Sequence, residues 1–230
     1  MSLPASLSKP LDNALAGDKL RRVTLDEKAY RWVKDALMAG RLPPGQVLTI
    51  SGLAEQFDIS PMPVREALNR LVSEHALTLQ PNRSLAVPVM TRDDLTEVTL
   101  IRCRLESLAA ECATPRLDAG GLAEMAALNR QMERDATLDA AAYLTLNRQF
   151  HFRLYAAAGL PSLLSLIESQ WVRIGPALRL HVDAERRPGP LPSHRALLAA
   201  LKARDAAAAG AAMIADLKTA AEDILPKLGA

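Results

Sequence analysis

Residues 53–87 decide the fold and read LAEQFDISPMPVREALNRLVSEHALTLQPNRSLAV. Just before them, Thr49 is placed to cap a short helix, whose apolar spacing stops at Asp58-Ile59-Ser60. Ser60 is placed to cap the next helix, and Pro61 suits its first position, where a missing N–H costs nothing. The pattern therefore predicts a helix-turn-helix over residues 50–69.

The second of these helices has one apolar face and one polar face. Its apolar residues recur at i, i+3, i+4 and i+7 spacing, at Val64, Ala67, Leu68 and Leu71. Two short alternating segments follow and flank a turn-rich tip at residues 81–84, which is typical of a two-stranded wing. We predict a winged helix-turn-helix, which places one helix in DNA. The alternative is a small helical subdomain whose arginines are only solvated.

Several separately spaced signals carry a resemblance to a family. These are A-G-R-L-P-P-G at 39–45, the LAEQF helix, S-P-M-P-V-R-E-A-L-N-R-L at 60–71 and P-N-R at 81–83. Together they resemble the GntR family of bacterial transcriptional regulators. The DNA contacts that the resemblance implies are Arg65, then Arg83 at the wing tip, Arg70 as a phosphate clamp, and Asn69, Ser60 and Asn82.

The chain departs from the family pattern in three places. Pro61 stands where the family usually has arginine, Met62 where a small polar residue is usual, and Ser84 where the wing usually has glycine. We therefore expect an operator unlike the family's common one.

Composition and charge suggest two domains. Residues 19–92 hold eleven Lys and Arg against seven Asp and Glu, whereas residues 93–230 hold sixteen against seventeen. Aromatic residues make up only 3% of the chain, which favours close helix packing in its second half. We predict a mainly α protein with a flexible arm at 1–20, a DNA-binding domain at 21–89 and a helical effector-binding and dimerisation domain at 90–230.

Periodicity and helix-ending signals divide the second domain into about six helices. They are predicted at 92–114, 121–134, 139–158, 161–180, 192–203 and 206–227, as an antiparallel bundle. The segments L-E-S-L-A-A at 105–110, N-R-Q-F-H at 147–151 and S-H-R-A-L-L-A-A-L at 193–201 resemble the FCD ligand-binding domain of the FadR subfamily.

Asn147 and His151 are four positions apart, so they share one helical face and can point into the same cavity. The FCD resemblance adds His194 and Asp216 and implies a divalent metal held by the four side chains, with Asp216 in place of the usual third histidine. Oxygen and nitrogen donors suit zinc first, with nickel or manganese as alternatives. The competing interpretation is that both histidines are core residues hydrogen-bonded to Asn147 and Asp216.

Arg102 lies one helical turn before Glu106 within an apolar stripe. It matches the arginine that FCD domains direct into their effector cavity, and a guanidinium beside a metal suits a carboxylate. The resemblance therefore implies a small organic acid as the effector. The alternative is that Arg102 pairs only with Glu106 or Glu111.

These features predict a homodimeric regulator, expected to be a repressor, that binds a palindromic operator in double-stranded DNA and responds to the acid. The alternatives are a metal-dependent helical-bundle enzyme and a DNA-binding protein with a vestigial ligand site. No G-x-S-x-G, H-E-x-x-H, phosphate loop or dinucleotide fingerprint occurs, which argues against an enzyme. Without a secretory signal or a bilayer-length apolar run, a cytoplasmic protein with no membrane partner is expected.

Overall fold

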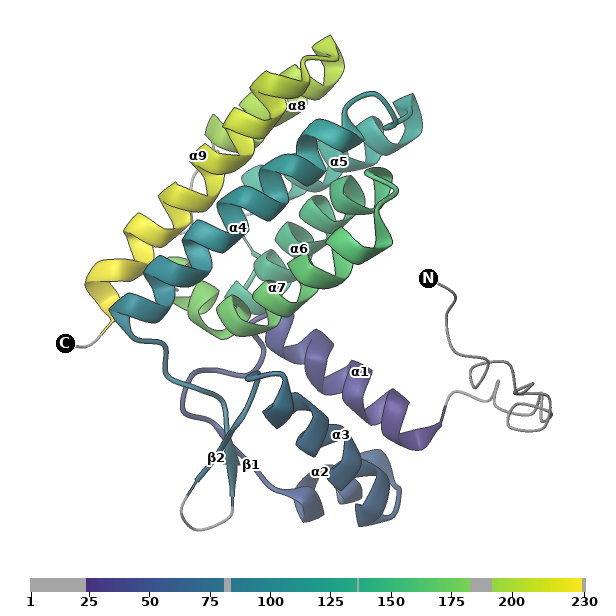
Figure 1. Cartoon of the computed structure of the whole chain (residues 1–230), viewed down its shortest axis with the longest axis vertical. Helices are drawn as coiled ribbons and strands as arrows, with labels where there is room; N and C mark the ends of the chain where they lie inside the picture. The colour runs from purple at the N-terminus through teal and green to yellow at the C-terminus, as the bar shows by residue number, and fades with distance from the viewer. Residues whose placement is uncertain (1–23, 81–83, 136, 183–191, 229–230) are drawn as a thin grey trace, which may run out of the picture.

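The computed structural model describes residues 24–80, 84–135, 137–182 and 192–228. It has an N-terminal unit with a small sheet, which we call the head, and a C-terminal unit of helices, which we call the bundle (Figure 1). The fold is mainly α, as predicted. The predicted arm at 1–20 lies outside the described residues, and no helix among those described is long and apolar enough to cross a membrane.

Among the described residues, the head contains three helices and three short strands. In chain order these are α1 (Leu25–Met38), β1 (Val47–Leu48), α2 (Ile50–Phe57), α3 (Pro61–Ser73), β2 (Thr78–Leu79) and β3 (Leu85–Ala86). The helix-turn-helix and the wing strands are confirmed. Strand β1 was not predicted: it pairs antiparallel with β3, opposite β2, and two residues are too few to give a period-2 pattern.

The two predicted caps of the helix-turn-helix had different outcomes. The Thr49 hydroxyl accepts a hydrogen bond from the Gly52 N–H at 3.1 Å, which confirms it as the cap of α2. Ser60 occupies the N-cap position of α3 with extended backbone, but its side chain makes no capping hydrogen bond. That part of the prediction was wrong, and Pro61 contributes because its ring already has the backbone φ of a helix start.

The bundle closely follows the predicted helices. It comprises α4 (Arg92–Ala113), α5 (Ala119–Arg134), α6 (Ala140–Ala157), α7 (Pro161–His181), α8 (Pro192–Ala203) and α9 (Ala206–Ile224). The last predicted helix, 206–227, was too long, because a 3₁₀ turn replaces it at Leu225–Lys227. Pro226 has no N–H for the carbonyl four residues earlier, so the α-helix cannot continue regularly.

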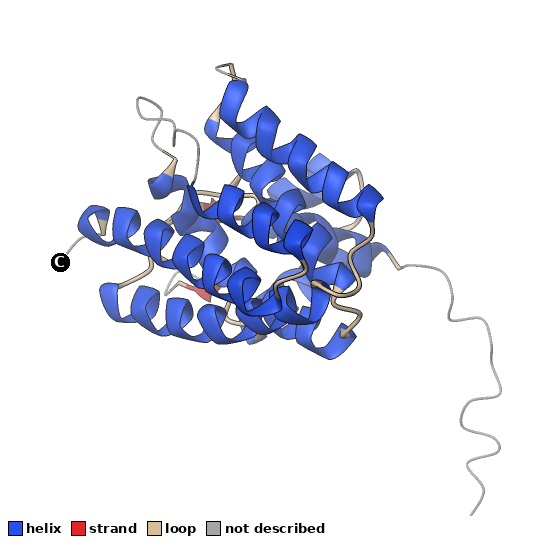
Figure 2. Cartoon of the chain, turned by 90° about the horizontal axis from the view of Figure 1, so that it is seen from above, coloured by secondary structure: helices blue, strands red, loops and turns tan. Residues whose placement is uncertain are grey.

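The helices of the bundle lie side by side around one apolar core (Figure 2). Helix α4 packs against α9 and α7, α5 packs against α6, and α8 packs against α9. Trp171, Phe150 and Tyr155 are among the largest fully buried side chains. Several polar side chains are enclosed within this packing, among them Glu106, His151 and His194.

Helix α7 of the bundle touches the end of α1 in the head (Figure 1). A Cβ atom added at Gly175 would lie 2.2 Å from the Leu37 carbonyl oxygen and 2.8 Å from Met38 Cα. Only glycine permits this approach of two backbones. The head therefore packs directly against the bundle.

Candidate functional site

The bundle contains a small enclosed cavity that brings together residues from four helices. Arg102 of α4, Asn147 and His151 of α6, His181 of α7 and Asp216 of α9 all line it. Its volume is about 20 Å³, which is room for roughly one water or ion. An organic acid would therefore require the surrounding helices to move apart.

Three of the four predicted metal ligands form one cluster. His151, His194 and Asp216 each offer a donor atom, and these atoms all lie within 4.8 Å of one another. Asp216 Oδ2 lies 3.3 Å from His151 Nε2, and Asp216 Oδ1 lies 3.4 Å from His194 Nε2. Asn147 lines the same cavity. Three of the four predicted ligands therefore lie together, and Asn147 shares the cavity with two of them, His151 and Asp216.

Burial controls the charge of this cluster. It lowers the pKa of His194 to about 4, against a weaker opposing effect of Asp216, so this imidazole is neutral at pH 7. Burial alone would raise the pKa of Asp216, but the two imidazoles and the Ser193 hydroxyl outweigh it and the pKa is lowered. The cluster therefore contains a carboxylate and at least one neutral imidazole.

These residues fit a metal ion. His194 Nε2 is buried and has no hydrogen-bond partner among the described residues, although an unpaired buried polar atom is costly. It faces a carboxylate that is ionised. A divalent cation at this point would satisfy both groups at once, and nitrogen and oxygen donors are suitable ligands for zinc.

Arg102 is engaged with Glu106, the alternative considered from the sequence. Both side chains are buried, with Arg102 Nε 2.6 Å from Glu106 Oε1 and Nη2 3.3 Å from Oε2. Burial alone would lower the pKa of Arg102, but the adjacent carboxylate outweighs it and the pKa is raised. The Arg102 guanidinium also lies 4.9 Å from the Trp171 ring centroid.

Four polar neighbours of the cluster were not predicted as site residues. Tyr155 donates a hydrogen bond to Glu106, and its hydroxyl oxygen lies 3.2 Å from His151 Nδ1. Tyr155 follows His151 by four positions, so helical spacing could have indicated it. The other three, Asn129, Glu133 and Ser193, gave no comparable signal because they lie on α5 and α8.

The predicted DNA-binding surface lies on α3. Arg65 and Asn69 are exposed on it, and Ser60 is exposed just before it. Asn82 and Arg83 of the wing tip lie outside the described residues. The described part of the surface therefore consists of the exposed face of α3 and the residue that precedes it.

Arg70 points elsewhere. It is five positions from Arg65, which places the two side chains about 140° apart around the helix. Its guanidinium lies 3.7 Å from the Tyr30 ring centroid and donates to Glu74 at 3.1 Å and to Glu27 at 3.0 Å. A role as a phosphate clamp would require these contacts to break.

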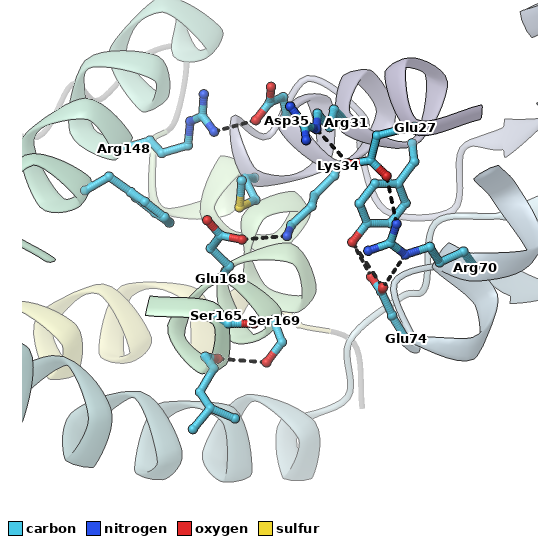
Figure 3. A pocket seen from close by; sticks show the side chains of 14 residues that line it. Glu27, Arg31, Lys34, Asp35, Arg70, Glu74, Arg148, Ser165, Glu168 and Ser169 are labelled. Carbon is cyan, nitrogen blue, oxygen red and sulfur yellow. Dashed lines mark hydrogen bonds and ion pairs between the residues drawn. The ribbon is translucent and has the colours of Figure 1, made fainter. Parts of the chain in front are cut away.

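A larger cavity, of about 690 Å³, lies between the head and the bundle (Figure 3). Lys34 Nζ of α1 lies 2.7 Å from Glu168 Oε2 of α7, and Asp35 Oδ1 lies 2.7 Å from Arg148 Nη1 of α6. The other charged side chains that line the cavity are also paired with one another. This pattern indicates a domain interface rather than a ligand site.

Helices α6 and α7 connect the head–bundle interface with the small cavity lined by Arg102, His151 and Asp216, which we call the donor cavity. On α6, Asn147 lines the donor cavity and the next residue, Arg148, pairs with the head. On α7, Leu178 lines the donor cavity, and Gly175 one turn earlier contacts α1. A movement of either helix around the donor cavity would therefore also change its contacts with the head.

Comparisons with known proteins agree with this geometry. Residues 25–87 match the family model of bacterial regulatory proteins of the gntR family, and residues 97–219 match that of the FCD domain. The HTH-type transcriptional regulator McbR of Escherichia coli K12 is 36% identical over 192 residues, 81% of this chain and 86% of that protein. The HTH-type transcriptional repressor GlaR of the same organism is 27% identical, over 83% of this chain and 91% of that protein.

Solved structures give the same picture. The structure of E. coli McbR/YncC matches with a TM-score of 0.82 and 31% identity, over 90% of this chain and 100% of that one. A putative GntR transcriptional regulator from Rhodococcus sp. RHA1 matches with a TM-score of 0.72 and 27% identity, over 87% of this chain and 97% of that one.

Proposed function

The chain belongs to the GntR family of transcriptional regulators and carries an FCD domain, and we propose that it is a metal-dependent, acid-responsive repressor. The observation that carries this proposal is the buried cluster of His151, His194 and Asp216 beside Arg102, in which His151 lies on α6, the helix whose Arg148 pairs with Asp35 of the head. Zinc is the proposed metal, with nickel or manganese as alternatives, and Asn147 is the proposed fourth ligand.

The charge of the donor cavity supports an acid effector only when the metal is present. Arg102 contributes one positive charge, whereas Glu106 and Asp216 contribute two negative charges. Without a cation the centre repels an acid. A divalent cation reverses the net charge and supplies a positive centre on which a carboxylate can be anchored.

The small size of the cavity supports a mechanism for the response. A bound acid needs more room than about 20 Å³, so α6, α7 and α9 must separate to admit it. Because α6 and α7 also contact the head, this separation would change how the head is held. Acid binding and operator binding would then be coupled through the head–bundle interface.

Metal and acid binding can be tested together. The purified chain is expected to take up one zinc per chain by elemental analysis, and a panel of small carboxylates is expected to raise its thermal midpoint only after zinc loading. Asp216→Ala is expected to lose both responses. Glu222→Ala is the matched control, because Glu222 is also an acidic residue of α9 but is exposed and does not line the cavity.

Two outcomes would count against this part of the proposal. If the chain takes up no zinc, nickel or manganese, the metal site is wrong. If metal binds but no acid stabilises the loaded protein, the alternative of a vestigial effector site is favoured.

For DNA binding, we propose that Arg65 reads a base and Asn69 and Ser60 contact the operator, with Asn82 and Arg83 at the wing. The exposure of α3 supports this assignment, as does the pairing of arginine with guanine in the major groove. The chain is proposed to bind a palindromic operator as a homodimer. Leu100 and Leu108, which share a face of α4 and are 62% and 45% exposed, support a second copy packed there.

Arg65→Ala is expected to weaken operator binding by about 1–3 kcal/mol, or roughly 5- to 150-fold, by fluorescence anisotropy at fixed salt. Arg130→Ala is the control, because this arginine is exposed on α5, in the bundle. DNA from upstream of the chain's own gene serves as the probe. Sedimentation of the same complex is expected to show two chains per duplex. Unchanged affinity of the Arg65 variant would remove this residue from the interface.

A further inference from the structure

The histidines of the cluster each make a hydrogen bond on the side away from Asp216. His151 Nδ1 lies 3.2 Å from the Tyr155 hydroxyl, and His194 Nδ1 lies 3.0 Å from Asn129 Oδ1. A neutral imidazole carries its proton on only one nitrogen, so its partner on one side decides what the other nitrogen offers. These two outer hydrogen bonds therefore determine what the cluster presents at its centre.

The Tyr155 hydroxyl has a single proton, and its strongest acceptor is Glu106. The Glu106 carboxylate is already held by the Arg102 guanidinium, so it lies fixed against Tyr155. A charged acceptor takes the proton in preference to a neutral one. The Tyr155 oxygen then offers His151 only a lone pair, and His151 Nδ1 must be the donor.

The orientation of the Asn129 side chain is settled in a similar way. Asn129 Nδ2 lies 2.9 Å from Glu133 Oε1, and this carboxylate is held in turn by Arg195 at 2.9 Å through each of two nitrogens. A carboxylate accepts, so the amide nitrogen faces Glu133. Asn129 Oδ1 must then face His194, and His194 Nδ1 must be the donor.

We propose that Tyr155 and Asn129 are positioning residues that accept a hydrogen bond from the Nδ1–H of His151 and His194, and so leave both Nε2 atoms directed at Asp216 and at the proposed metal. A cation bound at the centre of the cluster would then meet two imidazole nitrogens and a carboxylate. Such a cation would also give the buried His194 Nε2 a partner, which it lacks among the described residues.

The same network links the metal ligand to the effector anchor. Glu106 accepts from both Arg102 and Tyr155. An acid that draws Arg102 away from Glu106 would alter the hydrogen bond that orients His151. Glu106 would therefore couple the proposed metal ligand His151 to the proposed effector anchor Arg102. This inference rests on the metal and acid sites proposed above.

The tautomers can be read without any metal. Long-range ¹H–¹⁵N spectra of the metal-free full chain at pH 8 distinguish a protonated ring nitrogen from one with a lone pair, and a His151→Gln sample assigns the His151 signal. His151 and His194 are each expected to carry a proton on Nδ1. Tyr155→Phe removes the acceptor, and we expect His151 to shift to Nε2–H, where it can donate to Asp216.

The matched control is Tyr30→Phe. Tyr30 also donates to a glutamate, Glu74, at 2.8 Å, but it lies in the head. Tyr155→Phe is expected to lower zinc affinity by about 10- to 100-fold in titration calorimetry, whereas Tyr30→Phe leaves it unchanged. Asn129→Leu is expected to release the His194 tautomer and to weaken zinc binding similarly.

The positioning role of Tyr155 and Asn129 and the metal site can be contradicted by different results. A wild-type His151 without a proton on Nδ1, or a Tyr155→Phe spectrum identical to that of the wild type, would overturn the positioning role whether or not zinc binds. A chain with the expected tautomers that takes up no metal would instead contradict the metal site and leave the positioning role intact.

Discussion

Replacing Glu106 with leucine is expected to lower the free energy of unfolding by about 3–5 kcal/mol, because it leaves the Arg102 charge buried without its partner. Arg102 is 4% exposed and Glu106 is fully buried, so neither side chain can reach water without disturbing the core. For a chain of this size, the thermal midpoint should fall by roughly 6 °C or more.

A double-mutant cycle separates the charge effect from lost packing. Arg102→Met is expected to be destabilising for the same reason as Glu106→Leu, since it leaves a buried carboxylate. The double variant is expected to recover much of the loss, because two apolar side chains can replace a buried ion pair at little cost. Chemical denaturation of the four proteins measures the coupling.

The control substitution for this cycle is Glu97→Leu on the same helix. Glu97 pairs with Arg173 at 3.2 Å, but its side chain is 60% exposed. An exposed pair contributes less than about 1 kcal/mol, so Glu97→Leu should change stability little. A double variant no more stable than Glu106→Leu would show that Arg102 is not the source of the penalty.

Replacing Gly175 with alanine is expected to loosen the head from the bundle. The added Cβ would overlap the backbone of α1 at Leu37 and Met38, and backbone atoms cannot turn aside as a side chain can. Overpacking of this kind costs about 1–3 kcal/mol. The ion pairs of Lys34 and Arg148 with the opposite domain should weaken with it.

Hydrogen exchange localises this effect. Amides in the second half of α1 are expected to exchange faster in Gly175→Ala, while those of α4 and α9 keep their protection. If the interface transmits the acid signal, the variant should also lose the effect of the acid on operator affinity. Gly120→Ala is the control, because its Cβ would meet only the Asp118 carboxylate at 3.7 Å. Equal protection in the two variants would contradict a tight head–bundle contact.

Local signals in the sequence predicted most of the helices. The bounds of α8 were predicted residue for residue, and those of α3 and α4 differ only at their C-terminal ends, because proline, capping residues and apolar spacing act within a few residues. Strand β1 was not predicted, because it forms only through pairing with β3, almost forty residues away in the chain. The phosphate-clamp role of Arg70 was implied by the family resemblance, whereas its contacts with Tyr30 and Glu27 depend on how α1 packs against α3.

The sequence by itself determined the two-part plan of this protein and the GntR and FCD likeness, and it predicted the candidate donor residues on α6, α8 and α9. Only the tertiary structure decided what these donors face. The partners of Arg102, His151 and His194 were settled by packing, and so was a cavity with room for one ion. The physical reason is that hydrogen-bond partners and cavity volume are properties of several helices meeting, which no single segment of sequence encodes.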